Sequence, residues 1–228
     1  MAIARRAVGT VVEDTNISAG GTITFQKPAG TVSGDLLLAV YLGGDPGTGN
    51  LARAGWAQQV WSASGGACIA LSFIAGGAEP TSYAFTNNSG SLVTCGVGFI
   101  VGYSGVDNTT PMDVTATTGS FSNTFSHLAP SITTVTNGAM LVGLVMTASA
   151  VTYSTIDMNM IATNAAAGTA WSGASGDLLL PTAGASGTTT FTASLKSAGP
   201  GAMLALRPAG GAAAVIPDLT MAPLGRAS

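Results

Sequence analysis

Apolar and polar residues alternate with a period of two wherever the chain shows a pattern. Thr22-Ile23-Thr24-Phe25 alternates cleanly, and residues 35–42 (DLLLAVYL) form an apolar run of strand length after the turn at Ser33-Gly34. A period of two places successive side chains on opposite faces of an extended strand. Further strands are predicted at residues 67–74, 82–86, 92–103, 139–146, 188–193 and 202–207.

Turn-forming residues separate the predicted strands. Gly, Pro and Asn gather in short groups such as GGDPGTGN at 43–50, AGGAEP at 75–80 and DNTTP at 107–111. Many short strands divided by such turns predict an all-β fold, a sandwich or a barrel. The most apolar stretches are about a dozen residues long, shorter than the roughly 18 that a membrane helix needs. We therefore expect buried strands there and no membrane partner.

Charged residues are scarce. The 228 residues include 7 Lys+Arg and 10 Asp+Glu, so 7% are charged, where an ordinary soluble domain carries roughly 25%. This composition excludes a charge-rich disordered chain and a coiled coil. A formal net charge of −3 offers no basic face, so nucleic acid is not expected as a partner.

Some predicted strands are apolar on both faces, as in LLLAVYL and VGFIVGY. In a two-layer sandwich one face of each sheet meets water, so the second face of these strands must be covered by loops or by another subunit. We expect a subunit, because few charged residues are available to protect a free edge. The chain is therefore predicted to form a homo-oligomer.

The chain divides into a body and a tail. One β-sandwich domain is predicted over residues 1–208, with the first residues, up to Ala7, as a candidate arm. Residues 209–228 combine a Gly/Ala hinge with apolar and proline clusters, which can lie extended on a partner but cannot form a core. We predict a C-terminal docking arm that contacts its partner through Val215, Ile216, Pro217, Leu219, Met221 and Leu224.

The N-terminus shows no export signal. Arg5 and Arg6 are followed by Glu13 and Asp14 rather than by an apolar run of signal-peptide length. The protein is therefore expected to be made in the cytoplasm and used without export through a signal peptide.

Catalytic and metal-binding patterns are missing from the sequence. His127 is the single histidine, so a Ser-His or Cys-His site would have to form around it, and we interpret it as an ordinary strand or loop residue. The chain has no CxxC, no HExxH and no calcium-loop spacing. A surface calcium at Asp45 or Asp107 stays open. We assign no catalytic, cofactor-binding or metal-binding residue and expect no enzyme and no cofactor.

The cysteines could be free thiols or form a disulfide, and the aromatic residues could pack in the core or contact a ligand. Cys68 and Cys95 lie in apolar runs and are expected as buried free thiols, with a disulfide between neighbouring strands left open. Trp56 follows a glycine at the start of a predicted strand and is expected in the core. Trp171, in a Gly/Ala/Ser loop, and Tyr153 are the candidates for contact with a glycan.

One hexapeptide, SGDLLL, occurs at 33–38 and again at 175–180. Its flanks disagree, since the first copy continues AVYLGG and the second runs into Pro181. We interpret the repeat as coincidence. Asp35 and Asp177 are expected at strand starts, where their carboxylates would accept backbone N–H bonds from the preceding turn.

The order of several segments is suggestive: TVSGDLLLAV, then Gly55-Trp56, FIAGGAEPTSYAFT, FIVGYSGVDNTTPMDV, TNGAMLVGLV and AMLALRP. In this order the chain resembles, over roughly residues 8–208, the β-sandwich modules of minor tail or fibre-like structural proteins in tailed phages of actinobacteria. The resemblance implies a two-sheet antiparallel β-sandwich, jelly-roll-like, without catalytic residues.

The resemblance also implies a function and a location. It predicts a structural virion protein, a minor tail, tail-tip or fibre-like subunit whose partners are its own copies and other virion proteins. Two alternatives stay open. One is a capsid (head) decoration protein anchored by its terminal arm, and the other is a carbohydrate-binding module that contacts host cell-wall glycan through Trp171 and Tyr153.

Overall fold

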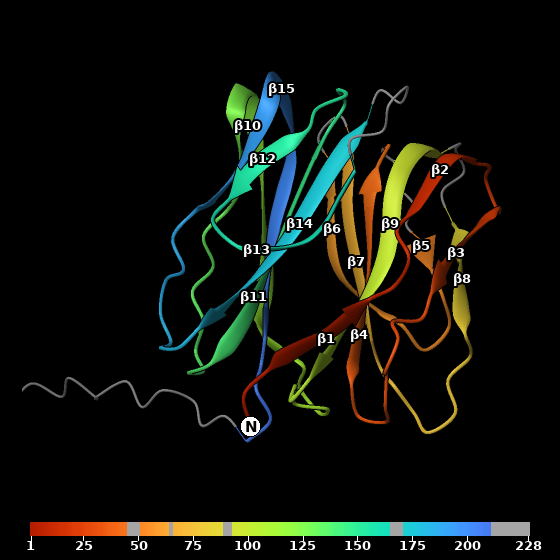
Figure 1. Ribbon diagram of the computed structural model, residues 1–228, viewed down its shortest axis with the longest axis vertical. Helices are drawn as coiled ribbons and strands as arrows, with labels where there is room; N and C mark the ends of the chain where they lie inside the picture. Colours follow the sequence, from red (N-terminus) through yellow and green to blue (C-terminus); the bar gives the residue numbers. More distant parts are fainter. Residues whose placement is uncertain (45–50, 64–65, 89–92, 165–170, 211–228) are drawn as a thin grey trace, which may run out of the picture.

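The computed structural model describes residues 1–44, 51–63, 66–88, 93–164 and 171–210 (Figure 1). Every regular element in these ranges is a β-strand, and all strand pairs are antiparallel. The predicted all-β antiparallel fold is therefore confirmed. The described residues include no helix that could cross a membrane.

The first half of the chain forms two sheets. Its strands are β1 (Ala4–Val8), β2 (Val12–Ile17), β3 (Thr22–Gln26), β4 (Leu36–Gly43), β5 (Leu51–Ala52), β6 (Ala57–Ala63), β7 (Ala67–Ile74), β8 (Ser82–Asn87) and β9 (Val93–Ser104). The large sheet has the order β1-β9-β4-β7-β6, and the small sheet has the order β3-β8-β5. β2 also pairs with β9, further along it than β1, so β1 and β2 are two parts of one edge strand.

The second half forms one large sheet that contains two long strands, β10 and β15. Its strands are β10 (Met112–Ala129), β11 (Ala139–Thr147), β12 (Tyr153–Ile156), β13 (Asn159–Asn164), β14 (Ser172–Leu180) and β15 (Thr189–Leu206). The order is β10-β15-β11-β14-β13, with β12 paired to β15.

The two halves repeat one strand order. In the first half, β1 pairs with β9, β9 with β4, β4 with β7, and β7 with β6. In the second half, β10 pairs with β15, β15 with β11, β11 with β14, and β14 with β13. The edge strand formed by β1 and β2 thus corresponds to β10, and β9 corresponds to β15. In the same way β4 corresponds to β11, β7 to β14, and β6 to β13. Pairing of first with last strand is the jelly-roll order, so the jelly-roll-like arrangement implied by the resemblance is present twice.

The small sheet also has a counterpart in the second half. Residues 126–129 of β10 pair with residues 189–192 of β15, and β12 pairs with residues 191–193. These segments occupy the positions of β3, β8 and β5. β10 and β15 therefore run continuously from one layer into the next, where the first half uses separate strands.

The two large sheets pack face to face around the central core (Figure 1). β4 lies opposite β11, β6 opposite β10, and β9 opposite β14. The β6 edge of the first sheet therefore faces the β10 edge of the second, and the β1 edge lies on the side of β13. Two identical modules related by a two-fold axis would pack in this way. Leu38 and Val40 of β4 meet Val142 and Leu144 of β11 in this core.

The second face of β4 is covered by the same chain. Leu37 and Tyr41 point away from the central core and pack with Phe25 and Phe85 of the small sheet, which lies on the right in Figure 1. All eight residues of β4 are buried. Our expectation that another subunit covers this face was therefore wrong, because the chain supplies both covering layers itself.

The second half buries its outer face in the same way. Leu141 and Val145 of β11 pack with Phe191 of β15, Met158 and Ile132 in a third core. The body thus has three cores between four layers. The expected antiparallel β-sandwich is confirmed, and each half adds an outer layer on the far side of its large sheet.

The hexapeptide SGDLLL does not mark this duplication. Its first copy leads into β4, whereas its second lies inside β14, and β14 corresponds to β7. The related segments are TVSGDLLLAV at β4 and TVTNGAMLVG at β11. Both strands begin just after a glycine with positive φ, 87° at Gly34 and 76° at Gly138, a conformation that side chains disfavour.

The N-terminus and the root of the arm lie together. β1 is an edge strand, so the candidate N-terminal arm is part of the large sheet from Ala4 onward. The amino group of Met1 donates to the carbonyl of Ala209 at 3.0 Å, and the Ala209 N–H donates to the carbonyl of Gly105 at 2.8 Å. These two hydrogen bonds hold Ala209, the first residue of the predicted arm, against the body.

Candidate functional site

Asp35 holds the turn before β4. Its Oδ2 accepts the N–H of Val32 at 2.9 Å, and its Oδ1 accepts the Nε–H of Arg6 at 2.8 Å. The side chain of Asp35 is almost fully buried. The expected strand-start role is confirmed for this residue.

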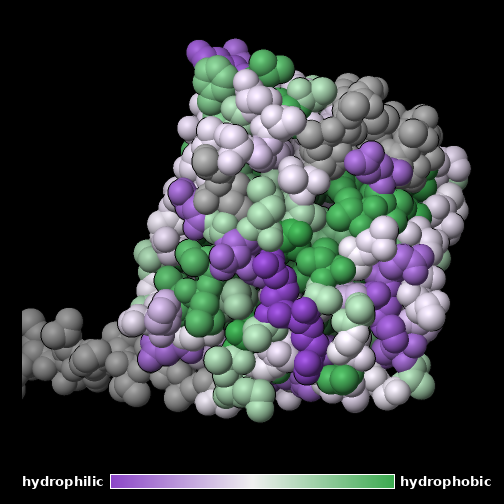
Figure 2. Space-filling view, viewed as in Figure 1, coloured by the Kyte–Doolittle hydropathy of each residue, from purple (hydrophilic) through white to green (hydrophobic). Residues whose placement is uncertain are grey.

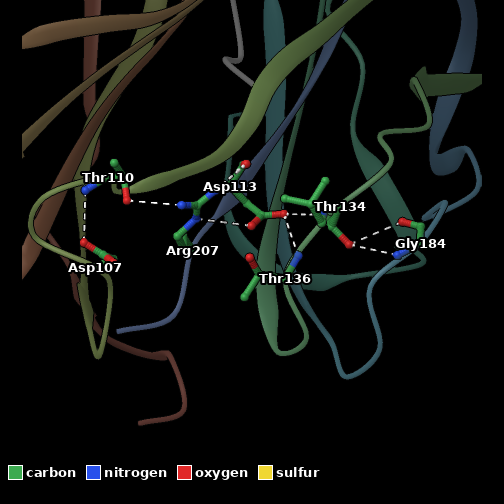
Figure 3. A network of polar contacts seen from close by, with 8 residues as sticks. Asp107, Thr110, Asp113, Thr134, Thr136, Gly184 and Arg207 are labelled. Atoms are coloured by element: carbon green, nitrogen blue, oxygen red, sulfur yellow. Dashed lines mark hydrogen bonds and ion pairs between the residues drawn. The ribbon is translucent and has the colours of Figure 1, made fainter. Parts of the chain in front are cut away.

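Asp113 likewise holds the turn before β11 by accepting backbone N–H groups (Figure 3). Its Oδ2 accepts the N–H of Val135 at 2.7 Å and that of Thr136 at 3.3 Å. Arg207 lies with Nε 3.5 Å from Oδ1 and donates from Nη2 to the Asp113 carbonyl at 3.1 Å. Its Nη1 also donates to Oγ1 of Thr110 at 3.3 Å.

The two carboxylates are equivalent in role but not in origin. Val32 and Val135 occupy the same place in the repeated TV segments, and each donates its N–H to a buried carboxylate held by an arginine. In the first half the carboxylate comes from residue 35, beside β4, and in the second from β10. Both networks therefore stabilise a turn inside the body.

The structure corrects the predicted strand-start position of Asp177. It lies inside β14, not at a strand start, because β14 begins at Ser172 and the SGD segment continues an existing strand. Tyr103 of β9 donates its hydroxyl to Oδ2 at 3.1 Å, and Nη1 of Arg5 lies 3.4 Å from the same oxygen. Burial raises the pKa of Asp177, against the opposing effects of Arg5 and Tyr103. This cluster joins the two halves of the chain.

His127 lies in β10, in agreement with the expected strand position. Its Nε2 is 2.9 Å from Oγ of Ser197, its Nδ1 is 3.2 Å from the hydroxyl of Tyr153, and Phe121 stacks on the ring with centroids 4.3 Å apart. Burial lowers the pKa of His127 to about 4, so the ring is neutral at ordinary pH. A serine beside a histidine can form a nucleophile and base, but His127 has no exposed surface.

The residues predicted to contact glycan are partly engaged in packing. Tyr153 is half-buried and its hydroxyl lies beside His127, while Trp171 is half-buried against the central core. Trp61 and Phe125 are more exposed, at 41% and 46%. Trp56 packs in an aromatic group of the first half, as expected for a core residue.

Cys68 is a buried free thiol, as expected, and burial raises its pKa strongly. The side chain of Cys95 lies outside the described residues. Oδ1 of Asp107 accepts the N–H groups of Thr109 and Thr110, and these hydrogen bonds lower the pKa of Asp107. Asp45 lies outside the described residues, within which no three acidic, His or Cys side chains gather as metal ligands.

Among the described residues, no strand pairs with the outer edge of β14 at its C-terminal end. Residues 178–180 pair with residues 139–141 of β11 on one side, whereas the pairing with β13 ends at Asp177. Leu178 and Leu179 are 38% and 39% exposed. In Figure 2 an apolar cluster covers this lower end of β14, on the left of the view. An edge with free backbone groups and exposed leucines is a template for an added segment.

A hollow of about 210 Å³ lies beside this edge. It is lined by Met1, Ala2, Asn137, Gly138, Leu179, Pro208, Ala209 and Gly210. The last described residue, from which the predicted arm departs, thus lines the same hollow as Leu179. The arm residues predicted to dock, Val215, Ile216, Pro217, Leu219, Met221 and Leu224, lie outside the described residues.

Sequence reasoning did not find this edge. The run LLL before Pro181 was a usable signal, because a proline ends strand pairing and leaves the preceding apolar residues at a sheet corner.

Comparison with protein-family models, curated proteins and solved structures finds no match to the chain.

Proposed function

We propose that the chain is a structural subunit of a tailed-phage virion, a minor tail, tail-tip or fibre-like protein that acts through protein–protein assembly. The observation that carries the proposal is the open apolar edge at Leu178 and Leu179 beside the root of the arm at Gly210. A free edge and the docking arm predicted to follow Gly210 would provide the two halves of an assembly contact.

The use of polar groups supports this proposal. Asp35, Asp113 and Asp177 are buried and bind arginines or turns within the body. Buried charges held in this way stabilise strands and turns and are not accessible to a dissolved substrate. The proposal accordingly assigns the chain no catalytic step and no cofactor.

The proposal is tested by locating the chain in particles. Antibodies against the body, applied to purified virions of the phage that encodes the chain, are expected to label the tail in electron micrographs. Label on the head would favour the decoration alternative. Particles that lack the chain in both labelling and mass spectrometry would contradict a structural role.

Deletion of the arm supplies the matched variant. A chain ending at Gly210 keeps every described strand and is expected to fold but to be lost from particles. Normal incorporation would contradict the docking role of the arm. Binding of the whole chain to host cell-wall glycan, lost in Trp171→Ala, would favour the carbohydrate-binding alternative.

A further inference from the structure

We propose that residues 215–221 of the arm (VIPDLTM) dock on a second copy of the chain, along the open edge of β14 at residues 178–180 and in the adjoining hollow. This inference rests on the proposed assembly function and names the surface that receives the arm. The partner is therefore another copy of the same chain.

The acceptor surface fits a short extended segment. Only three residues of β14 extend beyond β13, so the edge offers pairing for a segment of a few residues. Leu178 lies opposite Leu141 of the third core, and Leu179 lies opposite Met140 of the central core. The two leucines therefore present apolar surface on both faces of the edge, where an added strand would place its alternate side chains.

The arm has the matching chemistry. Residues 215–221 contain Val215, Ile216, Leu219 and Met221 with a single charge at Asp218. Pro217 cannot donate a backbone hydrogen bond, but an edge strand accepts proline where the missing N–H would face away from the sheet.

The position of the arm root favours a second copy over the same chain. Gly210 already lines the hollow, and five residues of extended chain span up to about 17 Å. Residues 215–221 of the same chain could enter this hollow of about 210 Å³ only if residues 211–214 reversed direction, whereas the arm of a neighbouring copy needs no such turn. Such a contact is either exchanged mutually in a two-fold dimer or repeated head-to-tail in a ring or filament.

The test uses the body that ends at Gly210 and a synthetic peptide of residues 211–228. All described strands and all three cores lie within residues 1–210, so the body is expected to fold without the arm. The peptide should bind saturably at one site per body, measured by titration calorimetry. Failure to bind would overturn the proposal.

Two matched substitutions locate the site. Leu179→Lys should weaken peptide binding about tenfold or more, because it places a charge on the apolar edge. Leu195→Lys, at a leucine that is 57% exposed, should leave binding unchanged. Equal effects of both substitutions, or none from Leu179→Lys, would overturn the site. Circular dichroism confirms that each variant is folded, and Leu178→Lys replaces Leu179→Lys if it is not.

Cross-linking tests whether the arm of one molecule reaches the edge of another. The body with Leu179→Cys is mixed with the full chain carrying Met221→Cys, and Leu195→Cys replaces Leu179→Cys in the control. A mixed disulfide is expected only with Leu179→Cys, and its absence would overturn the proposal. Light scattering separates docking on a second copy from docking on the same chain: the full chain should be an oligomer and the body a monomer, and a monomeric full chain would overturn the proposal. If the peptide binds the body but the chain is absent from virions, the proposed virion function is refuted and the docking contact stands.

Discussion

Each buried charged side chain of the three ion pairs is held by groups from other parts of the fold. Asp35 is held by Arg6 of β1, Asp113 by Arg207, and Asp177 by Tyr103 and Arg5. The strand-start position of Asp35 could be predicted, because a turn residue and the strand that follows it are neighbours in sequence. The position of Asp177 could not, since an identical hexapeptide enters a different strand environment.

His127 predicts a pH dependence of stability. The folded protein keeps the ring neutral down to about pH 4, whereas the unfolded chain takes up a proton below its ordinary value of 6.5. The contribution of His127 is therefore complete above pH 6.5 and is lost as the pH falls towards 4, with a loss of at most about 3 kcal/mol. The urea midpoint of the native protein should fall across this range.

His127→Gln provides the control, because glutamine does not titrate. Its stability should be lower at neutral pH but should change less between pH 6.5 and 4 than that of the native protein. The raised pKa of Asp177 acts in the opposite sense and is common to both proteins. Parallel pH profiles for the two proteins would contradict the assignment of this dependence to His127.

At the scale of elements, the sequence pattern predicted seven of the fifteen strands in the described residues in whole or in part (β3, β4, β7, β8, β9, β11 and β15) but not their partners. Residues 35–42 were expected as a strand, and β4 spans Leu36–Gly43. The long β10 was missed, because residues 112–129 are half-exposed and lack an apolar run. Its pairing with β15 forms along 12 aligned positions with several register shifts. These long-range contacts leave no periodic signal in either segment.

The packing of the two large sheets depends on small residues in β14. A Cβ added at Gly173 would lie 2.6 Å from Cβ of Leu42 in β4. Gly173→Ala should therefore push the two sheets apart locally and lower the free energy of unfolding by about 1–3 kcal/mol. Gly77→Ala is the matched control, because a Cβ there meets no atom within 4 Å. Equal denaturant midpoints for both variants would contradict this close approach.

At the scale of the whole molecule, the two halves should unfold together. Each large sheet covers one face of the other, so opening either half exposes the central core of both. The full chain is expected to show one calorimetric transition, with a calorimetric enthalpy close to the van't Hoff enthalpy. Two separate transitions would show instead that each half is stable on its own outer core.

The scarcity of charge also has a different meaning at this scale. We took it as a sign that a second subunit covers the apolar strand faces, but the second half of the chain covers those of the first. Three ion pairs also remove Asp35, Asp113 and Asp177 from contact with water. The surface is therefore poorer in charge than the composition indicates.

The sequence by itself determined the all-β class and the position of the most apolar strands, among them β4, β7, β9 and β11, because period-two alternation and turn residues act locally. It also indicated that β4 is covered on both faces. Only the tertiary structure decided what covers it, since apolar residues record that a face is buried and not which surface buries it. The duplication, the place of Asp177 and the open edge of β14 depend on pairing between distant strands, and they became visible only in the folded chain.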